Sequence, residues 1–368
     1  MKTYMFPGQG SQSRGMGAAL FDAFPEITAQ ADEILGYSVK ELCVTDPRGE
    51  LNRTQFTQPA LFVVNALSYL QKVAEDGKPD YLAGHSLGEF NALWAAGVFD
   101  FATGLQLVRK RGELMSQAPR GGMAAILNAS KEQIEAALQS HGLTAIDLAN
   151  YNTPTQIVIS GDIDEIAKAQ HCFTGNALYY PLNTSGAFHS RFMRPAQEEF
   201  TAFLAQFELQ APAIPVIANV TAQPYDPAAI AATLASQISS TVRWSESMHH
   251  LLGLDAAMTL VEVGHGDVLT KMARTIQQRL ALAAPAAAPA TAPAAAAPAP
   301  DATAKPDPVH RVREWNHRHP VGTRVTSTVA GYGELETRTE ALVLFGHRAA
   351  VYMKGYNGYF DLDELQAA

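Results

Sequence analysis

Cysteine is scarce in this 368-residue sequence, and Cys43 and Cys172 stand apart from each other, outside any paired motif. Isolated cysteines form neither a disulfide framework nor a CxxC pair for metal or redox chemistry, so we expect a reducing, cytoplasmic environment. Basic residues are also few, because 27 Lys and Arg stand against 36 Asp and Glu and leave a formal net charge of -9. Such a chain lacks the excess of Lys and Arg that neutralises phosphates, which argues against nucleic acid as a partner.

Long apolar runs are missing as well. No stretch of membrane-spanning length is free of proline or charge, so we expect a soluble protein with no membrane partner. The amino-terminal segment reaches Pro7 before an apolar run of signal-peptide length forms, and we expect no secretory leader. Hydrophobic residues still make up 47% of the chain. This composition supports a sizeable core, and the length predicts two or more domains.

Alanine and proline dominate residues 281–308, which carry almost no charge and few large apolar side chains. Recurring prolines oppose a helix and favour polyproline II, so we expect a semi-rigid linker between a domain at 1–280 and a module at 309–368. The first domain alternates short strands with helical segments, the pattern of an α/β fold with a largely parallel sheet. Within it, about residues 122–188 follow the order β-α-β-β-α-β, which suits an inserted ferredoxin-like subdomain.

The carboxy-terminal module has a different character. Its β-forming residues cluster between glycine-rich turns at 323–329, 338–345, 349–353 and 359–362, which predicts a small antiparallel sheet or barrel of unknown role.

Two groups of charged or titratable residues stand out in this module. We interpret its histidines as surface residues, because no acidic or cysteine ligand stands at the spacing of a metal site. These are His310, His317, His319 and His347. A basic cluster either docks an acidic protein surface or is a solvated face, and the second reading is favoured. It consists of Arg311, Arg313, Arg318 and Arg324.

Residues 84–88 read Gly-His-Ser-Leu-Gly where an apolar extended run meets an amphipathic segment at 89–96. A G-x-S-x-G at a strand-to-helix junction forces a tight turn, since the glycines let the flanking backbone pass closely, and the serine hydroxyl is presented in a cleft. The helix N-terminus would stabilise negative charge on an attacked carbonyl oxygen. Ser86 is therefore a candidate nucleophile, and the alternative is a chance match in a glycine-containing loop.

A second glycine-rich segment, residues 8–12, follows a short strand at 3–6. It resembles the start of a dinucleotide fingerprint, but Ser13 occupies the third glycine position and no suitable βαβ unit follows. We therefore reject a nucleotide-binding role. The loop is either a plain tight turn or a source of a second oxyanion donor beside Ser86.

Arg111 falls in the middle of the apolar half if residues 101–115 form a helix. A guanidinium that faces the core keeps its charge and requires an anion. That anion is either an internal Asp or Glu or a substrate carboxylate held near Ser86. His189, in a loop of small residues before a predicted helix, is either a structural histidine or the base for Ser86, with His85 as its rival.

The sequence resembles malonyl-CoA:acyl carrier protein transacylases over residues 1 to about 280. Six motifs occur in the family's order, at residues 6–12, 57–60, 84–89, 111–112, 188–190 and 262–264. The resemblance implies an α/β-hydrolase-like large domain with a ferredoxin-like insert and an active site in the cleft between them. It also implies Ser86 as the nucleophile, His189 as its base, and the backbone amides of Gln9 and Leu87 as the oxyanion hole.

Substrate recognition also follows from the resemblance. It implies that Arg111 clamps the malonyl carboxylate, with malonyl-CoA as the donor substrate and neither a bound cofactor nor a metal. Leu87 and Phe188 resemble their counterparts in malonyl-selective members, and residues 186–189 are closer to the freestanding acyltransferases of polyketide assembly lines. His265 stands where the family commonly has proline. The further substrate-binding residues implied are Gln58, Asn152, Phe188 and His85.

The function expected from this resemblance is ping-pong transfer of a malonyl group, through a malonyl-Ser86 ester, to the phosphopantetheine thiol of an acyl carrier protein. The setting is polyketide or fatty acid biosynthesis, with polyketide synthase modules as further partners. One alternative is a hydrolase that edits carrier-bound acyl groups, although such relatives as a rule lack an arginine like Arg111. Another is a docking subunit acting through the carboxy-terminal module, against which Ser86 and His189 argue.

Overall fold

The computed structural model describes residues 1–184, 186–255, 257–283, 308–327, 334–344, 348–354 and 359–367. Two compact units emerge, Met1–Ile276 and Gln277–Ala368. Most of the predicted Ala/Pro linker, residues 284–307, lies outside the described residues, as does His347.

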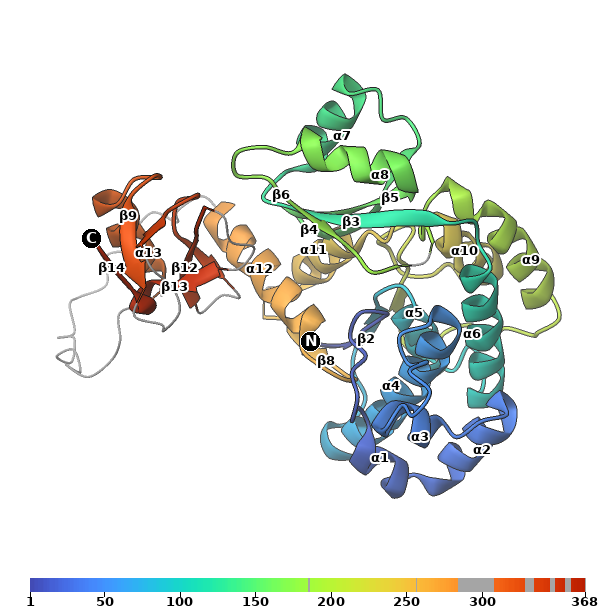
Figure 1. The fold of residues 1–368 in the computed structure, drawn as a ribbon. Coiled ribbons are helices and arrows are strands. Elements are labelled where there is room, and N and C mark those ends of the chain that lie inside the picture. Colours follow the sequence, from blue (N-terminus) through green and yellow to red (C-terminus); the bar gives the residue numbers. More distant parts are fainter. Residues whose placement is uncertain are drawn as a thin grey trace. The chain divides into compact units, whose positions relative to one another are not determined.

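A four-stranded parallel sheet forms the centre of the first unit (Figure 1). Its strands lie side by side in the order β7 (Val216–Ile217), β2 (Tyr81–Gly84), β1 (Lys2–Phe6) and β8 (Thr259–Glu262). β1 and β2 are almost entirely buried, as apolar strands at the centre of a parallel sheet are expected to be. All neighbouring pairs are parallel, so the carboxyl ends of these strands share one edge of the sheet.

Helices surround this sheet and complete the main core. They are α1 (Ala18–Ala23), α2 (Pro25–Leu35), α3 (Val39–Val44), α4 (Thr54–Asp76), α5 (Gly88–Ala95), α6 (Phe101–Ser116), α9 (Arg194–Leu204) and α10 (Ile230–Ser236). A further helix, α11 (Trp244–Leu254), contributes no described residue to this core. The helix predicted at 101–115 is thus present as α6, and the Asp100 carboxylate caps it by accepting a hydrogen bond from the Thr103 amide at 2.8 Å.

A second, antiparallel sheet lies between α6 and α9 in the chain. Its elements are β3 (Gly121–Leu127), α7 (Lys131–Ser140), β4 (Ile146–Thr153), β5 (Gln156–Asp162), α8 (Ile163–Ala169) and β6 (Leu178–Pro181). The strand order is β4-β5-β3-β6, and every neighbouring pair is antiparallel. Both helices cover the same face of this sheet (Figure 1).

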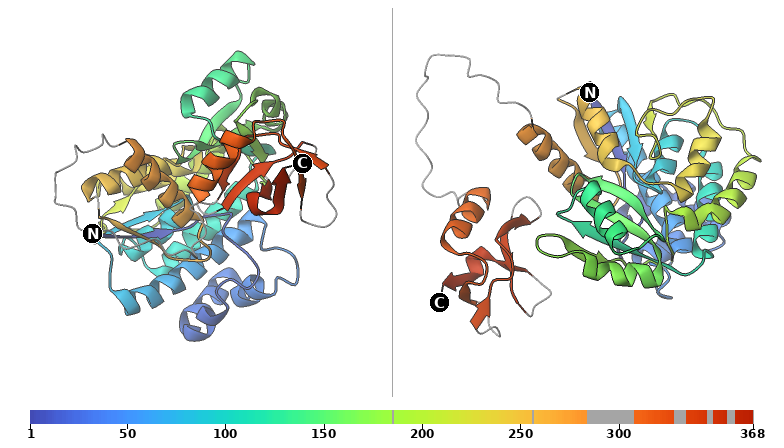
Figure 2. Two further views of the ribbon diagram at one scale, coloured as in Figure 1. Left: turned by 90° about the vertical axis from the view of Figure 1, so that its left-hand side faces the viewer. Right: turned by 90° about the horizontal axis from the view of Figure 1, so that it is seen from above.

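Alternation along β3 explains how this second sheet packs. Ala124 and Ile126 belong to the small core beneath α7 and α8, whereas Met123 and Ala125 belong to the main core. Successive side chains of a strand point to opposite faces, so the sheet is buried on both sides. Figure 2 shows the parallel sheet and this second sheet, with their helices, from two further directions. The backbone also joins them, because the Tyr151 amide donates to the Val242 carbonyl at 2.9 Å.

Described separately, the carboxy-terminal unit contains α13 (Pro308–Arg318) and two three-stranded antiparallel sheets, in the orders β10-β9-β14 and β11-β12-β13. The strands are β9 (Arg324–Ser327), β10 (Glu334–Glu336), β11 (Leu342–Leu344), β12 (Arg348–Tyr352), β13 (Tyr359–Asp361) and β14 (Leu365–Ala367). Val312 and Trp315 of α13 pack against its apolar core. The strand predicted at 338–345 is reduced to β11, because residues 338–341 lie outside the strands.

Helical structure extends beyond the prediction at two places. α12 (Val268–Ala283) runs into the segment predicted as linker, because its first proline is Pro285 and the alanine and leucine before it are strong helix formers. α13 was not predicted at all. Pro308 is its first residue, where proline's fixed φ suits a helix start.

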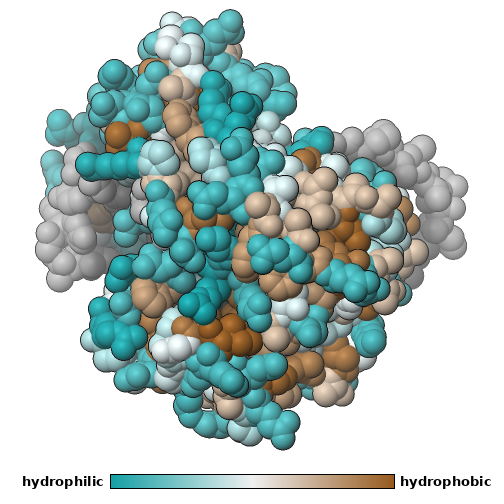
Figure 3. Space-filling model, turned by 90° about the vertical axis from the view of Figure 1, so that its right-hand side faces the viewer, coloured by the Kyte–Doolittle hydropathy of each residue, from teal (hydrophilic) through white to brown (hydrophobic). Residues whose placement is uncertain are grey.

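Two features of the described residues concern the expected environment. None of their helices is long and apolar enough to cross a membrane. Their His, Cys, Asp and Glu side chains form no group of three or more that could hold a metal ion. Hydrophilic side chains dominate the face of the molecule drawn in Figure 3.

Candidate active site

Ser86 lies in the sharp turn between β2 and α5, with φ at +52°, a left-handed conformation that residues other than glycine rarely adopt. The flanking glycines are required by close backbone contacts. A Cβ on Gly88 would lie 2.0 Å from the Phe6 carbonyl oxygen, and one on Gly84 would lie 2.0 Å from the Gly88 carbonyl carbon. The turn therefore has the strand-to-helix geometry that the pentad predicts.

Asn219 holds this turn from the segment that follows the neighbouring strand. Its Oδ1 accepts a hydrogen bond from the Ser86 amide at 2.8 Å, and its Nδ2 donates to the Gly84 carbonyl at 2.6 Å. Asn219 follows β7, which pairs with β2, so the shared edge of the parallel sheet brings it beside Ser86. Sequence reasoning missed this residue. The only available signal was its place just after a short apolar segment.

Ser86 and His189 are in direct contact, with 2.7 Å between Ser86 Oγ and His189 Nε2. His189 Nδ1 lies 3.0 Å from the Gln237 carbonyl oxygen and 3.2 Å from that of Ser240. Because carbonyls only accept, Nδ1 carries the hydrogen and Nε2 presents its lone pair to Ser86. Burial, together with the charge of Arg111, lowers the pKa of His189 to about 3. The imidazole is thus neutral and able to accept a proton.

Arg111 reaches the same point from α6, and it is 1% exposed. Its Nη1 donates to Gln58 Oε1 at 2.7 Å, and its Nη2 donates to Gln237 Oε1 at 2.8 Å and to Ser86 Oγ at 3.1 Å. These acceptors are all neutral. Its buried Nε has no hydrogen-bond partner among the described residues. Burial lowers the pKa of Arg111 to about 10, so the guanidinium remains charged at neutral pH.

Gly112 explains why Gln58 is available to Arg111. A Cβ at this position would lie 3.2 Å from the Thr54 carbonyl oxygen and 3.3 Å from Gln55 Cα, both on α4. Glycine therefore allows α6 and α4 to approach closely. The side chain of Gln58, on α4, then lies against the guanidinium that precedes Gly112 in the chain.

The loop after β1 lies against the Ser86 turn. A Cβ on Gly8 would be 2.4 Å from the His85 carbonyl oxygen and 3.5 Å from the Leu87 backbone nitrogen. Among the described residues, the backbone amides of Gln9 and Leu87 donate no hydrogen bond to another residue. Both amides are thus available to an oxyanion in this region. The Gln9 side chain donates from Nε2 to Thr54 Oγ1 at 3.3 Å.

His85 and Asn152 pair with each other, with 2.8 Å between His85 Nε2 and Asn152 Oδ1. Burial lowers the pKa of His85, and its ring packs edge-on against Trp244 at 5.6 Å. The imidazole in contact with Ser86 Oγ is therefore that of His189. Phe188, the residue before it, is buried in the main core.

Gln237 joins the separate parts of the site. Its Nε2 donates to the Ser86 carbonyl and to Glu89 Oε2, both at 2.7 Å. Its Oε1 accepts from Arg111, and its backbone carbonyl accepts from His189. Sequence reasoning did not single out Gln237 or the buried Glu89. Glu89 appeared only as the last residue of the motif at 84–89, and no pattern marked Gln237.

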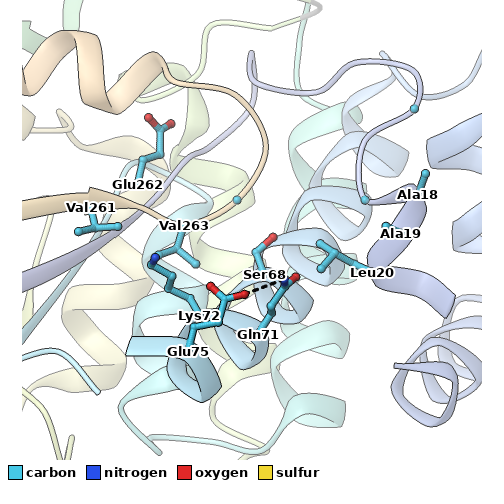
Figure 4. Close-up of a pocket in the computed structure, with 13 residues that line it drawn as sticks. Ala18, Ala19, Leu20, Ser68, Gln71, Lys72, Glu75, Val261, Glu262 and Val263 are labelled. Atoms are coloured by element: carbon cyan, nitrogen blue, oxygen red, sulfur yellow. Dashed lines mark hydrogen bonds between the residues drawn. The ribbon is translucent and has the colours of Figure 1, made fainter. Parts of the chain in front are cut away.

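Cavities among the described residues of the first unit include the following two. One, of about 650 Å³, is lined by residues of α7 and β4 together with His189 and Ser190. The other, of about 530 Å³, is lined by residues of α1, α4 and β8, and Figure 4 shows Gln71 there in its hydrogen bond to Glu75. Ser86 and Arg111 line neither of them.

Comparison with known proteins agrees with this geometry. The family model described as "Acyl transferase domain" matches residues 3–307. The polyketide biosynthesis malonyl CoA-acyl carrier protein transacylase BaeC of Bacillus velezensis is 56% identical over 281 residues, which cover 75% of this chain and 97% of that protein. PksC of Bacillus subtilis, named in the same words, is 56% identical over 282 residues, covering 76% of this chain and 98% of that protein.

Solved structures lead to the same family. A malonyl CoA-acyl carrier protein transacylase from Burkholderia pseudomallei matches with a TM-score of 0.75 at 60% identity, covering 76% of this chain and 98% of that one. A malonyl-transacylase in complex with its type II PKS acyl-carrier protein matches with a TM-score of 0.71 at 34% identity, covering 75% and 93%. This mixed α/β chain therefore belongs to the acyl transferase domain family and, within it, to the malonyl-CoA:acyl carrier protein transacylases.

Proposed function

We propose that this protein transfers a malonyl group from malonyl-CoA to the phosphopantetheine thiol of an acyl carrier protein, through a malonyl ester on Ser86. One observation carries the proposal: Ser86 Oγ lies 2.7 Å from a neutral imidazole nitrogen of His189 and 3.1 Å from the buried guanidinium of Arg111. A nucleophile, its base and a carboxylate receptor thus meet at one atom.

The first half-reaction loads the enzyme. His189 Nε2 takes the proton of Ser86 Oγ as that oxygen attacks the thioester carbonyl carbon, and the backbone amides of Gln9 and Leu87 stabilise the oxyanion. The carbon–sulfur bond then breaks, and the sulfur of coenzyme A receives the proton from His189. The carbonyls of Gln237 and Ser240 keep the imidazole in the required tautomer and orientation throughout.

The second half-reaction reverses these roles. His189 takes the proton of the phosphopantetheine thiol as its sulfur attacks the ester carbonyl of malonyl-Ser86. The ester carbon–oxygen bond breaks, and Ser86 Oγ recovers the proton from His189. The malonyl group leaves as a thioester of the carrier protein, and the enzyme returns to its starting state.

Arg111 selects the acyl group. Its buried Nε has no acceptor among the described residues, and a carboxylate would provide the charge-assisted partner that the neutral amides around it do not. An acetyl group leaves the buried charge unpaired, so acetyl-CoA should load poorly. Gln58 fixes one edge of the guanidinium, while Phe188, His85 and Asn152 are proposed to line the rest of the acyl site.

Polyketide biosynthesis is the proposed setting. It is supported by the printed names of BaeC and PksC and by the structure of a relative bound to its acyl-carrier protein. The same comparison supports malonyl-CoA and an acyl carrier protein as the substrates, with polyketide synthase modules as further partners, and the proposal includes no bound cofactor.

The domain interpretation rests on topology. We propose an α/β-hydrolase-like large domain at 1–280 with a ferredoxin-like insert at about 122–188. Support for the insert comes from its strand order, β4-β5-β3-β6, in which the first strand, β3, lies between the third, β5, and the fourth, β6. An Ala/Pro linker at 281–308 would lead to a β-rich module at 309–368.

The arginines of the carboxy-terminal module give little support to a docking subunit. Arg318 pairs with Glu314 at 2.5 Å, and Arg311 pairs with Asp363. Charges neutralised inside the module contribute less to the attraction of an acidic partner. Catalysis by the first unit is therefore the function proposed here.

Intact-mass spectrometry tests the proposal in two steps. After mixing with malonyl-CoA, the protein should gain one malonyl group that maps to Ser86. Addition of a holo carrier protein should move that mass to the phosphopantetheine arm. Release of free malonate without carrier loading would instead identify an editing hydrolase, and the absence of any adduct would refute the proposed ester.

A further inference from the structure

Glu89 is a completely buried carboxyl group that the proposed mechanism does not use. It is the second residue of α5, three positions after Ser86, and it is 0% exposed. Burial raises its pKa to about 7, while hydrogen bonds and the charge of Arg111 act in the opposite direction. A carboxyl group costs free energy in such a place unless its oxygens are well compensated, so its partners define what it does.

Three donors, two from residues 219–225 and one from Gln237, converge on Glu89. Oε1 accepts from the Asn219 backbone amide at 2.9 Å and from the Tyr225 hydroxyl at 2.7 Å. Oε2 accepts from Gln237 Nε2 at 2.7 Å. An amide nitrogen can only donate, so the partners of both oxygens favour the carboxylate over the carboxylic acid.

This carboxylate and the Ser86 carbonyl both accept from Gln237 Nε2 and so favour one orientation of the Gln237 amide. With Nε2 directed at Glu89 and at the Ser86 carbonyl, Oε1 is left to face Arg111. A reversed amide would direct its N–H groups at the guanidinium and its oxygen at the carboxylate, with repulsion on both sides. Glu89 thereby controls the guanidinium without touching it.

The same carboxylate also anchors the Ser86 turn. It holds the backbone amide of Asn219, whose side chain binds the backbone of Ser86 and Gly84 on either side of the turn. We propose that Glu89 is a positioning residue for malonyl loading, which orients Gln237 toward Arg111 and fixes Asn219 against Ser86. This inference rests on the function proposed for Ser86 and Arg111.

The test is Glu89→Gln in the full chain, assayed for loading of Ser86 from malonyl-CoA and from acetyl-CoA. The new amide keeps the shape but directs N–H groups either at Gln237 Nε2 or at the Asn219 amide and the Tyr225 hydroxyl, so the contact with Gln237 or with Asn219 is lost. We expect kcat/KM for malonyl-CoA to fall about ten- to a hundredfold and the malonyl-to-acetyl ratio to fall about tenfold.

Glu165→Gln is the matched control. The Glu165 carboxylate also accepts a hydrogen bond from a backbone amide, that of Ala145 at 2.8 Å. Glu165, however, lies on α8, which covers the second sheet. This variant should change the malonyl rate by no more than about twofold, as expected of a substitution outside the site.

Combining Glu89→Gln with Arg111→Ala distinguishes a positioning role of Glu89 from a general loss of structure. If Glu89 acts on selectivity through Arg111, then Glu89→Gln should cause no further change in the malonyl-to-acetyl ratio of the Arg111→Ala enzyme. A wild-type protein that forms no malonyl-Ser86 would refute the proposed function itself. A wild type that loads, beside a folded Glu89→Gln variant with unchanged rate and ratio, would refute only the role of Glu89.

Tyr225→Phe keeps the inference testable if Glu89→Gln does not fold. It removes one donor and leaves the ring, so the carboxylate loses stabilisation and its pKa rises. Loading that needs the carboxylate is lost as pH falls, and this loss should begin about one pH unit higher than in the wild type. His189 has a pKa of about 3, and Arg111, the other charged group acting on Glu89, does not titrate in this range. An unchanged pH profile would overturn the inference.

Discussion

Replacement of Arg111 by alanine gives the most direct test of substrate choice. The wild-type guanidinium is 1% exposed, has neutral partners and an Nε that lacks a hydrogen-bond partner among the described residues. A malonyl carboxylate would accept about two hydrogen bonds from it, each contributing about 1.5–3 kcal/mol because both groups are charged. At about 1.4 kcal/mol for each factor of ten, kcat/KM for malonyl-CoA should fall by about 10² to 10⁴.

Acetyl-CoA carries no carboxylate and should lose far less. The substitution also removes the hydrogen bonds to Gln58 and Gln237, but the contact of Arg111 with a reacting atom is the one to Ser86 Oγ at 3.1 Å. The acetyl rate should therefore change by less than about tenfold. Loading of each donor is followed by release of coenzyme A. Arg109→Ala is the control, since Arg109 lies exposed on the same helix and donates to the Ile34 carbonyl at 2.7 Å. An Arg111→Ala enzyme that keeps the wild-type malonyl-to-acetyl ratio would refute the carboxylate clamp.

Three further outcomes are expected. Ser86→Ala should abolish the malonyl adduct in intact-mass spectra while the variant stays folded by circular dichroism, and an adduct at another residue would contradict the assignment. Gly88→Ala should lower the melting temperature by several degrees or prevent folding, because the new Cβ would lie 2.0 Å from the Phe6 carbonyl oxygen. Gly253→Ala on α11 is the control: its Cβ would have no atom within 4 Å, so the melting temperature should stay unchanged or rise slightly. Deletion of residues 284–368 should leave the rate of malonyl loading of Ser86 within about twofold of the wild-type rate in the coenzyme A release assay. Ser86, His189 and Arg111 all lie in the first unit. Loss of loading would show that the module is needed for catalysis.

Local patterns were sufficient for the parts of the fold that present the site. The turn at Ser86 follows from two glycines between a strand and a helix, and the burial of Arg111 follows from helical periodicity over 101–115. Both signals are contained in a short window of sequence, and short-range sterics decide them. The helix α13 was not predicted, although Pro308 and the spacing of Val312 and Trp315 are sequence signals of a helix start and an apolar face.

The polar network could not be predicted in the same way. Asn219, Gln237 and Glu89 are ordinary polar residues in the sequence, and nothing in their immediate surroundings marks them as buried. Their roles come from the parallel pairing of β2 with β7 and from the packing of residues 237–240 against His189. The contacts of Asn219 and Gln237 with Ser86 join residues 133 and 151 positions apart. Those of Gln237 and Ser240 with His189 join residues 48 and 51 positions apart, so both sets become visible only with the tertiary structure.

The placement of Gln237 between Glu89 and Arg111 resolves a conflict of charge in the buried site. A direct ion pair would neutralise the guanidinium and force a malonyl carboxylate to compete with Glu89 for it. The neutral amide of Gln237 forms a hydrogen bond to each charged group. Its oxygen accepts from Arg111 Nη2, and its nitrogen donates to Glu89 Oε2. The negative charge nearby then helps to keep Arg111 protonated, while the guanidinium retains an unpaired N–H for the substrate. In such a site, Glu89 compensates the charge of Arg111 before the substrate binds, and the guanidinium still binds an acyl group that carries a carboxylate more tightly than one that does not.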